Sequence, residues 1–208
     1  MEKTNYFKKE INYIKDKSLK KDIKVLIELL PEYFFTIPAS STGKYHPKFA
    51  LGESGLVRHT KVAVRIAYEL LNNNTVGCKF TEHDKDLMIM ALILHDGLKN
   101  GEEHSKYTKF DHPLLISKYI MENKSKLSLD IDDLRKICSM IESHMGEWTY
   151  DSYNQKEVLP KPKTAEQRFV HMCDFLASRK FLNVSFTENN IKDWQMINIV
   201  YIKIFKKT

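Results

Sequence analysis

The chain has 208 residues, enough for one domain that buries about 70% of the surface of its unfolded chain. Its 42% hydrophobic and 29% charged residues are ordinary for a globular protein, and seven glycines and six prolines are too few for a turn-rich β-sandwich. The net charge of +6 favours an anionic partner such as a phosphate ester, and no apolar run is long enough to span a membrane.

The N-terminal segment and the cysteines indicate the cellular setting. Residues 1–21 are charged throughout and lack the apolar centre of a signal peptide, so we expect a cytoplasmic protein. Cys78, Cys138 and Cys173 are odd in number and widely spaced, which favours free thiols over disulfides or a cysteine zinc site.

Hydrophobic periodicity predicts helices along most of the chain. Ile23, Leu26 and Leu30 lie at i, i+3 and i+7, the spacing of an apolar helix stripe. Residues 87–94 form an uninterrupted apolar run after a capping sequence at residues 81–84, and their Met, Leu and Ala content favours a buried helix over a buried strand. The predicted helices are 5–18, 20–30, 56–70, 87–94, 113–123, 132–145, 164–179 and 191–205.

Two segments break this periodicity. Residues 36–54 are rich in hydroxyl side chains and turn formers, and residues 146–163 contain Pro160 and Pro162 near their end, so both are predicted loops. A long ordered loop inside a compact domain often has a function. No segment keeps the period of two that strands show, so the predicted fold is all-α, a single compact helical bundle.

Histidines and aspartates interrupt the apolar surfaces of several predicted helices. A single inward histidine is most often a hydrogen-bonded core residue, whereas a buried carboxylate is costly unless it is paired or bound to a metal. A shared cation explains several such groups on different helices at once. These residues are His59, the His95-Asp96 pair that ends the apolar run, His144 and Asp174.

The residue types suit phosphate chemistry at a metal. Imidazole nitrogens and carboxylate oxygens bind divalent ions such as Mn²⁺, Fe²⁺, Co²⁺, Ni²⁺ and Zn²⁺. A bound cation lowers the pKa of water from about 15.7 towards about 7–9 and neutralises phosphate charge, so metal-bound hydroxide would attack a phosphoester. Lys99 follows His95 by four residues and would present its ammonium to that phosphate, although an exposed lysine here would also be unremarkable.

Three motifs resemble those of the HD-domain metal-dependent phosphohydrolases. Residues 56–60 look like the first histidine motif, residues 94–99 like the His-Asp motif, and residues 171–179 like the segment with the closing aspartate. The resemblance implies the all-α HD fold, and it implies that one metal is bound by His59, His95, Asp96 and Asp174.

Members of this superfamily with two metals carry extra histidines between the second and last motifs. His112 and His144 stand at the matching places, and Asp96 would then bridge both ions. The resemblance thus implies one or two divalent metal ions as cofactor, with Mn, Fe, Ni, Co, Zn and Mg as candidates. Asp96 and Lys99 are the expected catalytic residues.

The similarity is closest to the HD-type 3′→5′ exoribonucleases and the related domain of conjugative relaxases. It rests on the Phe-Phe-Thr-Ile-Pro-Ala-Ser segment that ends at Ser40, on His46, and on residues 55–60. Ser40, His46 and Lys99 are the expected substrate-binding residues, with the loop from Ser40 to His46 closing over the substrate.

The resemblance also suggests how the chain is divided. It covers residues 34–180, which we expect to form the HD core. Residues 1–33 are expected to be a helical extension packed on that core, and residues 181–208 to form a C-terminal helix.

The expected reaction is hydrolysis of a phosphoester in a nucleotide or a short single-stranded oligonucleotide. One alternative is a phosphodiesterase or nucleotidase for small signalling nucleotides. Another is a non-catalytic adaptor on an HD scaffold, in which the positive charge and the rings of Tyr45, Trp148 and Tyr150 would bind nucleic acid. No membrane contact is expected, and the sequence identifies no protein partner.

Other histidines are set aside. The His83-Asp84 pair lies at the polar start of a helix and is interpreted as a cap. His104 lies in a charged loop, and His171 could belong to ordinary packing or to the surroundings of the metal ligands, so neither is given a definite role.

Overall fold

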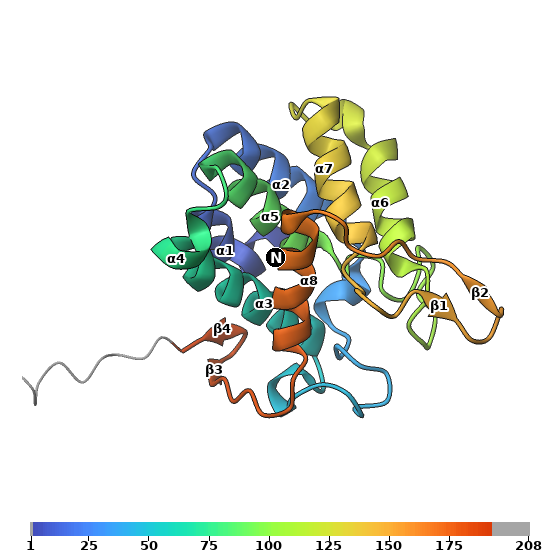
Figure 1. Cartoon of the computed structure of the whole chain (residues 1–208). Coiled ribbons are helices and arrows are strands. Elements are labelled where there is room, and N and C mark those ends of the chain that lie inside the picture. The colour runs from blue at the N-terminus through green and yellow to red at the C-terminus, as the bar shows by residue number, and fades with distance from the viewer. Residues whose placement is uncertain (1, 193–208) are drawn as a thin grey trace, which may run out of the picture.

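The computed structural model describes residues 2–192, which form a bundle of helices with two small hairpins (Figure 1). The predicted all-α class is confirmed. The α-helices of this part of the chain are α1 (Lys8–Tyr13), α2 (Lys17–Leu29), α3 (Gly55–Asn72), α4 (Asn74–Gly77), α5 (Glu82–Leu94), α6 (His112–Glu122), α7 (Ile131–Glu142) and α8 (Ala165–Ala177).

Shorter elements join these helices. The 3-10 helices are η1 (Lys3–Phe7), η2 (Glu32–Phe35), η3 (Lys48–Ala50) and η4 (Lys124–Lys126). The strands pair as two antiparallel hairpins, β1 (Tyr150–Asp151) with β2 (Lys156–Glu157) and β3 (Phe186–Thr187) with β4 (Asn190–Ile191). None of the helices within residues 2–192 is long and apolar enough to cross a membrane.

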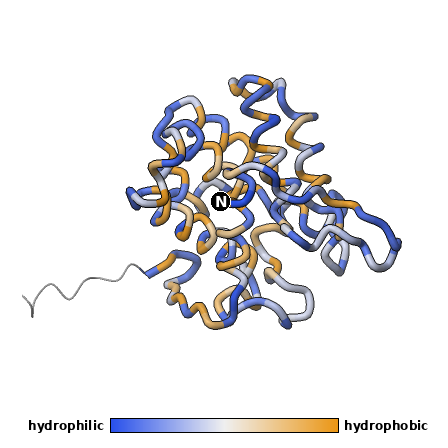
Figure 2. The backbone as a smooth tube through the Cα atoms, viewed as in Figure 1, coloured by the Kyte–Doolittle hydropathy of each residue, from blue (hydrophilic) through white to orange (hydrophobic). Residues whose placement is uncertain are grey.

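Helix α5 runs through the centre of the bundle. Its residues from Asp86 to Leu94 are all buried, because residues 87–94 are apolar on every face and the helix packs against α2, α3, α7 and α8 (Figures 1 and 2). Burial of each Leu, Ile or Met side chain in this run stabilises the fold by roughly 1.5–3 kcal/mol. The residues that follow Leu94 therefore begin inside the core.

Helices α3 and α8 face each other across the end of α5. Helix α3 is amphipathic, and its buried residues pack against α8 and α5. Helices α6 and α7 lie side by side, and α7 also packs against α5 and α8 (Figure 1). This arrangement brings four helices, α3, α6, α7 and α8, towards the point where α5 ends.

The start of α5 is fixed by Thr81. Its side chain accepts a hydrogen bond from the N–H of Asp84, as the predicted capping sequence requires. The His83-Asp84 pair lies in the first turn and is not itself the cap. His83 instead pairs with Asp133, and Asp84 pairs with Lys136, so both residues tie α5 to α7.

The predicted helix over residues 5–18 ends early, at Tyr13. The chain then extends before α2 begins, because the buried carboxylate of Asp86 accepts hydrogen bonds from the N–H groups of Lys15 and Asp16. Side-chain acceptors of this kind compete with the helical hydrogen bonds of the backbone. Asp86 thereby fixes the first helices against α5.

Other predicted boundaries also differ. Helix α7 ends at Glu142 and not at residue 145, because the backbone leaves helical geometry at Ser143 and turns through Gly146 with φ of +68°. The predicted loop over 146–163 contains the β1–β2 hairpin. The predicted helix over 191–205 starts wrongly, since Ile191 lies in β4, and its residues from 193 onwards lie outside the described part of the chain.

Candidate metal centre

Helix α5 delivers the His95-Asp96 pair into the core, where both side chains are buried. The Nδ1 of His95 lies 2.7 Å from the carbonyl oxygen of Leu92, so this edge of the ring faces its own helix. The Nε2 edge faces the interior of the bundle. It lies 3.4 Å from Asp96 Oδ2 and 3.4 Å from Asp174 Oδ1.

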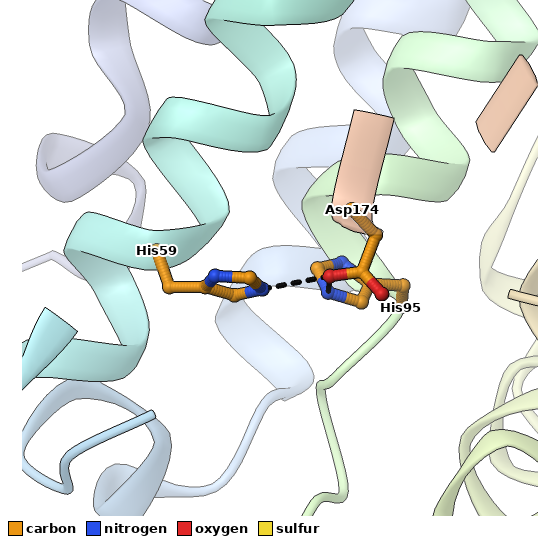
Figure 3. Close-up of side chains that lie close together, drawn as sticks. All are labelled: His59, His95 and Asp174. Carbon is orange, nitrogen blue, oxygen red and sulfur yellow. Dashed lines mark hydrogen bonds and ion pairs between the residues drawn. The ribbon is translucent and has the colours of Figure 1, made fainter. Parts of the chain in front are cut away.

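Asp174 of α8 and His59 of α3 complete one side of this cluster (Figure 3). Asp174 Oδ1 lies 2.8 Å from His59 Nε2, and the carboxylate points between the two imidazole rings of His59 and His95. One ligand atom from each of these three residues lies within 4.8 Å of the other two. The spacing suits a single metal ion.

His112 and His144 meet Asp96 from the other side. Their Nε2 atoms lie 3.0 Å and 3.8 Å from Asp96 Oδ1, and 3.4 Å from each other. His112 is the first residue of α6, whereas His144 follows the last residue of α7 by two positions. The prediction that His144 lies on its helix is therefore wrong, although its side chain does face inward. His95, Asp96 and His144 form a second group whose ligand atoms lie within 4.8 Å of one another.

Backbone carbonyl groups orient three of these histidines. The Nδ1 atoms of His95, His112 and His144 each lie 2.7 Å from the carbonyl oxygen of the residue three positions earlier. A carbonyl oxygen only accepts, so Nδ1 is the donor, and in a neutral imidazole Nε2 then presents a lone pair. Hydrogen bonds of this kind orient the histidines that bind metals in proteins.

These lone pairs face carboxylate oxygens, which are acceptors as well. Within residues 2–192, His95 Nε2 and Asp96 Oδ1 are buried and have no hydrogen-bond partner. Converging buried acceptors repel one another unless a cation or a proton lies between them. Because the donors are imidazole nitrogens and carboxylate oxygens, the residues fit a divalent metal ion.

The charges of the cluster agree with this fit. Burial raises the pKa of Asp96, but Lys99 and His95 outweigh burial and hold that pKa well below its usual range. The pKa of Asp174 is likewise well below its usual range, because the imidazoles of His59 and His95 outweigh burial. Burial lowers the pKa of His95, but Asp96 and Asp174 outweigh burial and raise it to about 10. Without a metal ion, a proton on His95 therefore balances the negative charge of Asp96 and Asp174, which a bound metal ion would neutralise.

Lys99 lies against the same carboxylate. Its Nζ is 2.5 Å from Asp96 Oδ2, and 11% of its side chain is exposed. Helix α5 has ended by this point, and a series of turns from residue 95 brings the lysine back to Asp96. Its largely buried ammonium group thus stands beside the candidate ligand atoms of Asp96.

The predicted loop residues reach the cluster to different extents. The ring of His46 packs edge-on against His59 with centroids 5.0 Å apart, and its buried Nδ1 has no hydrogen-bond partner among the described residues. Ser40 lies towards the surface, with its Oγ 3.4 Å from Thr42 Oγ1 in the same loop. The structure therefore brings His46 to the cluster and leaves Ser40 in the more exposed part of the loop.

The cluster opens to solvent over a small area. Asp174, with 17% of its side chain exposed, is more accessible than the buried His59, His95, Asp96, His112 and His144. The loop over residues 36–54 meets the segment before α6, where Ser41 Oγ lies 3.3 Å from the N and from the Oγ1 of Thr108. Asp174 is therefore the most exposed of these candidate ligands.

His171 supports the site, a contribution that the sequence left undecided. Its Nδ1 donates to the carbonyl oxygen of His144 over 2.7 Å, and a Cβ at Gly146 would come within 2.1 Å of its ring. Glycine is therefore required where the chain turns past this ring. His171 lies three residues before Asp174 on α8, and this i, i+3 spacing places both on neighbouring positions of one face.

Comparison with protein families matches residues 56–178 of the chain to the HD domain. The matched segment holds all of the clustered histidines and aspartates, from His59 to Asp174. Comparison with the curated proteins and with the solved structures gives no match. Because the match covers more than half of its residues, the chain belongs to the HD domain family, whose members in general bind divalent metals and act as metal-dependent hydrolases.

Proposed function

We propose that this protein is a metal-dependent phosphohydrolase that cleaves a phosphoester bond in a nucleotide or a short single-stranded oligonucleotide. The observation that carries the proposal is the convergence of buried histidine Nε2 atoms on the carboxylate of Asp96, with His112 Nε2 at 3.0 Å and His95 Nε2 at 3.4 Å. Buried carboxylates and imidazoles that converge in this way require positive charge, which a divalent metal supplies.

Asp96 is suited to bridge two ions. Its Oδ2 lies on the side of His95, and its Oδ1 lies on the side of His112 and His144. Several imidazole ligands favour Mn, Fe, Co, Ni or Zn over Mg, which prefers oxygen ligands and retains water. The proposed ligands are His59, His95, Asp96, His112, His144 and Asp174.

When bound, the metal supplies a Lewis acid for phosphate oxygens and a source of hydroxide near neutral pH. Lys99 is the residue of the chain that we assign to charge stabilisation. Its Nζ lies 2.5 Å from Asp96 Oδ2, so it reaches an anion seated beside this carboxylate. A positioned ammonium stabilises the negative charge that builds on phosphate oxygens during cleavage.

His46 and Ser40 are assigned to substrate binding. Burial, followed by the charges of His59 and Lys99, lowers the pKa of His46 to about 3, so its imidazole is neutral at physiological pH. A neutral imidazole with a free Nδ1 offers one hydrogen bond to a substrate without adding charge. Ser40 and its neighbouring hydroxyl groups lie further out, where they can donate to a second phosphate.

The small opening favours a second candidate, a phosphodiesterase or nucleotidase for small signalling nucleotides. Asp174 has only 17% of its side chain exposed, and a compact substrate enters such a site more readily than a long strand. A non-catalytic adaptor is less well supported, because binding alone requires no set of converging buried metal ligands.

A screen of divalent metals against substrates at neutral pH tests the proposal. The substrates are mononucleotides, cyclic dinucleotides and single-stranded oligonucleotides, and the dependence of the rate on length separates the two enzymatic candidates. We expect metal-dependent hydrolysis by the wild type and none by Asp96→Ala. A wild type that binds no metal and hydrolyses nothing overturns the proposal.

The role of Lys99 has its own test. Lys99→Ala should lower kcat/KM by about 10²–10³-fold, the usual effect of removing one group that stabilises transition-state charge. Lys106→Ala, a change of an exposed lysine on the neighbouring loop, is the matched control. Unchanged turnover by Lys99→Ala on every substrate that the wild type cleaves contradicts the assignment.

A further inference from the structure

Three planar side chains form a row beside the metal ligands. The rings of Trp148 and Phe175 are stacked, with centroids 6.0 Å apart and an interplanar angle of 18°. The guanidinium group of Arg179 lies over the Phe175 ring, 4.0 Å from its centroid. Phe175 and Arg179 are four residues apart along α8 and its end, so they share one side of that segment.

The row is connected to the cluster along the chain and through one further ring. Phe175 directly follows the candidate ligand Asp174 on α8. His171 links the row to a second ligand, because its ring centroid lies 6.4 Å from that of Trp148 while its Nδ1 donates to the carbonyl oxygen of His144. The segments that carry two of the candidate metal ligands therefore also carry the stacked rings.

Two properties of the row point to a ligand. Trp148 is 45% exposed, so much of the indole surface is open to solvent beside a site for phosphate chemistry. Arg179 donates to the carbonyl oxygen of Phe175 and to the hydroxyl of Ser178, and among the described residues it pairs with no carboxylate. The open face of Trp148, together with an arginine without a countercharge over the neighbouring Phe175 ring, complements a planar, anionic molecule.

We propose that Trp148, Phe175 and Arg179 form a subsite for a nucleobase of the substrate, with the base stacked on the open face of Trp148. Bases stack on aromatic side chains whatever their sequence, and the charge of Arg179 favours a phosphate that follows the base. This inference rests on the proposed function. It deepens that function, because it selects nucleotides over phosphate esters that lack a base.

Paired substrates test the subsite. A dinucleotide is compared with the same compound lacking one base, at each of its two positions in turn. The wild type should prefer the intact dinucleotide by about 5- to 100-fold in kcat/KM for one position, the usual contribution of one stacked base. Trp148→Ala should abolish this preference through KM, and Trp148→Phe should retain most of it. Tyr153→Ala removes an exposed ring outside the row, 93% accessible, and should keep the wild-type preference.

Two results would overturn the subsite. One is equal kcat/KM of the wild type for intact and abasic substrates at both positions. The other is an equal loss on both substrates in Trp148→Ala, which would show that the ring only supports the fold.

A binding measurement separates this inference from the proposed function. In Trp194→Phe, which leaves Trp148 as the sole tryptophan of the sequence, adenosine monophosphate should quench the fluorescence and ribose 5-phosphate should not. Quenching without hydrolysis of any substrate supports the subsite and contradicts the proposed function. Hydrolysis without either quenching or base preference supports the function and overturns the subsite.

Discussion

Asp174 Oδ1 and His59 Nε2 lie 2.8 Å apart and join helix α8 to helix α3 at the candidate metal centre. These two helices also pack against each other along their buried faces. A carboxylate in such a place is costly to bury unless it has partners. Asp174 has the imidazoles of both His59 and His95, so the geometry of the ligands depends on the packing of the two helices.

Asp174→Asn tests the ligand role with little change in shape. The amide removes the charge that a divalent ion requires. Replacing a residue that only hydrogen-bonds to a metal ligand typically weakens metal binding by about 10–100-fold, and we expect a larger loss here. The measurement is the metal content of the purified protein by elemental analysis, with thermal unfolding as a check on the fold. Asp132→Asn, at a carboxylate with 86% of its side chain exposed, is the control. Wild-type metal content in Asp174→Asn would remove this residue from the ligand set.

Metal binding should release a proton and strengthen with rising pH. His95, with its pKa raised to about 10, is protonated at neutral pH in the metal-free protein, and its imidazole must lose that proton to bind a metal ion. His144 adds no proton, because burial and the charge of His95 lower its pKa to about 3. The affinity for Mn²⁺ should therefore rise about tenfold per pH unit between roughly pH 6 and 9, the slope for one proton. Calorimetric titration in buffers of different ionisation enthalpy measures this release, and an affinity independent of pH contradicts it.

The apolar run over residues 87–94 predicted the central helix, and with it the position of the His95-Asp96 pair. This prediction was possible because a helix without a polar face has to be buried, whatever its neighbours. The burial of carboxylates could not be interpreted so directly. Asp86, on the same helix, is as well buried as Asp96, yet it accepts the N–H groups of Lys15 and Asp16. Those partners are some seventy residues away in sequence, and no local pattern reveals them.

The end of α7 and the hydrogen bond from His171 could not be predicted from the sequence for a related reason. The turn that frees His144 from its helix depends on Gly146 and on the ring of His171, which arrives from α8. Hairpins with two-residue strands, such as β1–β2, are too short to show a period of two. Long-range packing therefore decides these details, whereas periodicity decided the helices themselves.

His171 should position His144 for metal binding. His171→Phe keeps the bulk of the ring but removes the hydrogen bond to the His144 carbonyl oxygen, and we expect about 10–100-fold weaker metal binding. His171→Asn, which retains a donor, should restore part of the affinity. The control is His104→Phe, which makes the same change at a histidine that stacks on Tyr33, with centroids 4.7 Å apart. This variant should keep the wild-type metal affinity. Titration with Mn²⁺ measures the affinity, and an unchanged value in His171→Phe would assign this ring to packing alone.

Lys61 and Glu10 form a buried ion pair that joins α3 to α1, with Nζ and Oε2 3.3 Å apart. Only 1% and 3% of their side chains are exposed. Glu10→Gln leaves the ammonium of Lys61 in the core without a countercharge, so we expect the free energy of unfolding to fall by about 3–5 kcal/mol. The double variant Glu10→Gln with Lys61→Met removes both charges and should recover most of that loss, because an apolar pair avoids the desolvation of two ions.

Urea denaturation of the two variants and the wild type measures these free energies, with the metal content as a second observable. Neither residue contacts the candidate ligands through its charged group, so metal content should match the wild type in every variant that remains folded. A double variant as unstable as Glu10→Gln would contradict the account. In that case the stability would come from the hydrogen bond of Lys61 to Asn190 Oδ1, 3.1 Å long, and not from the balance of charge between α1 and α3.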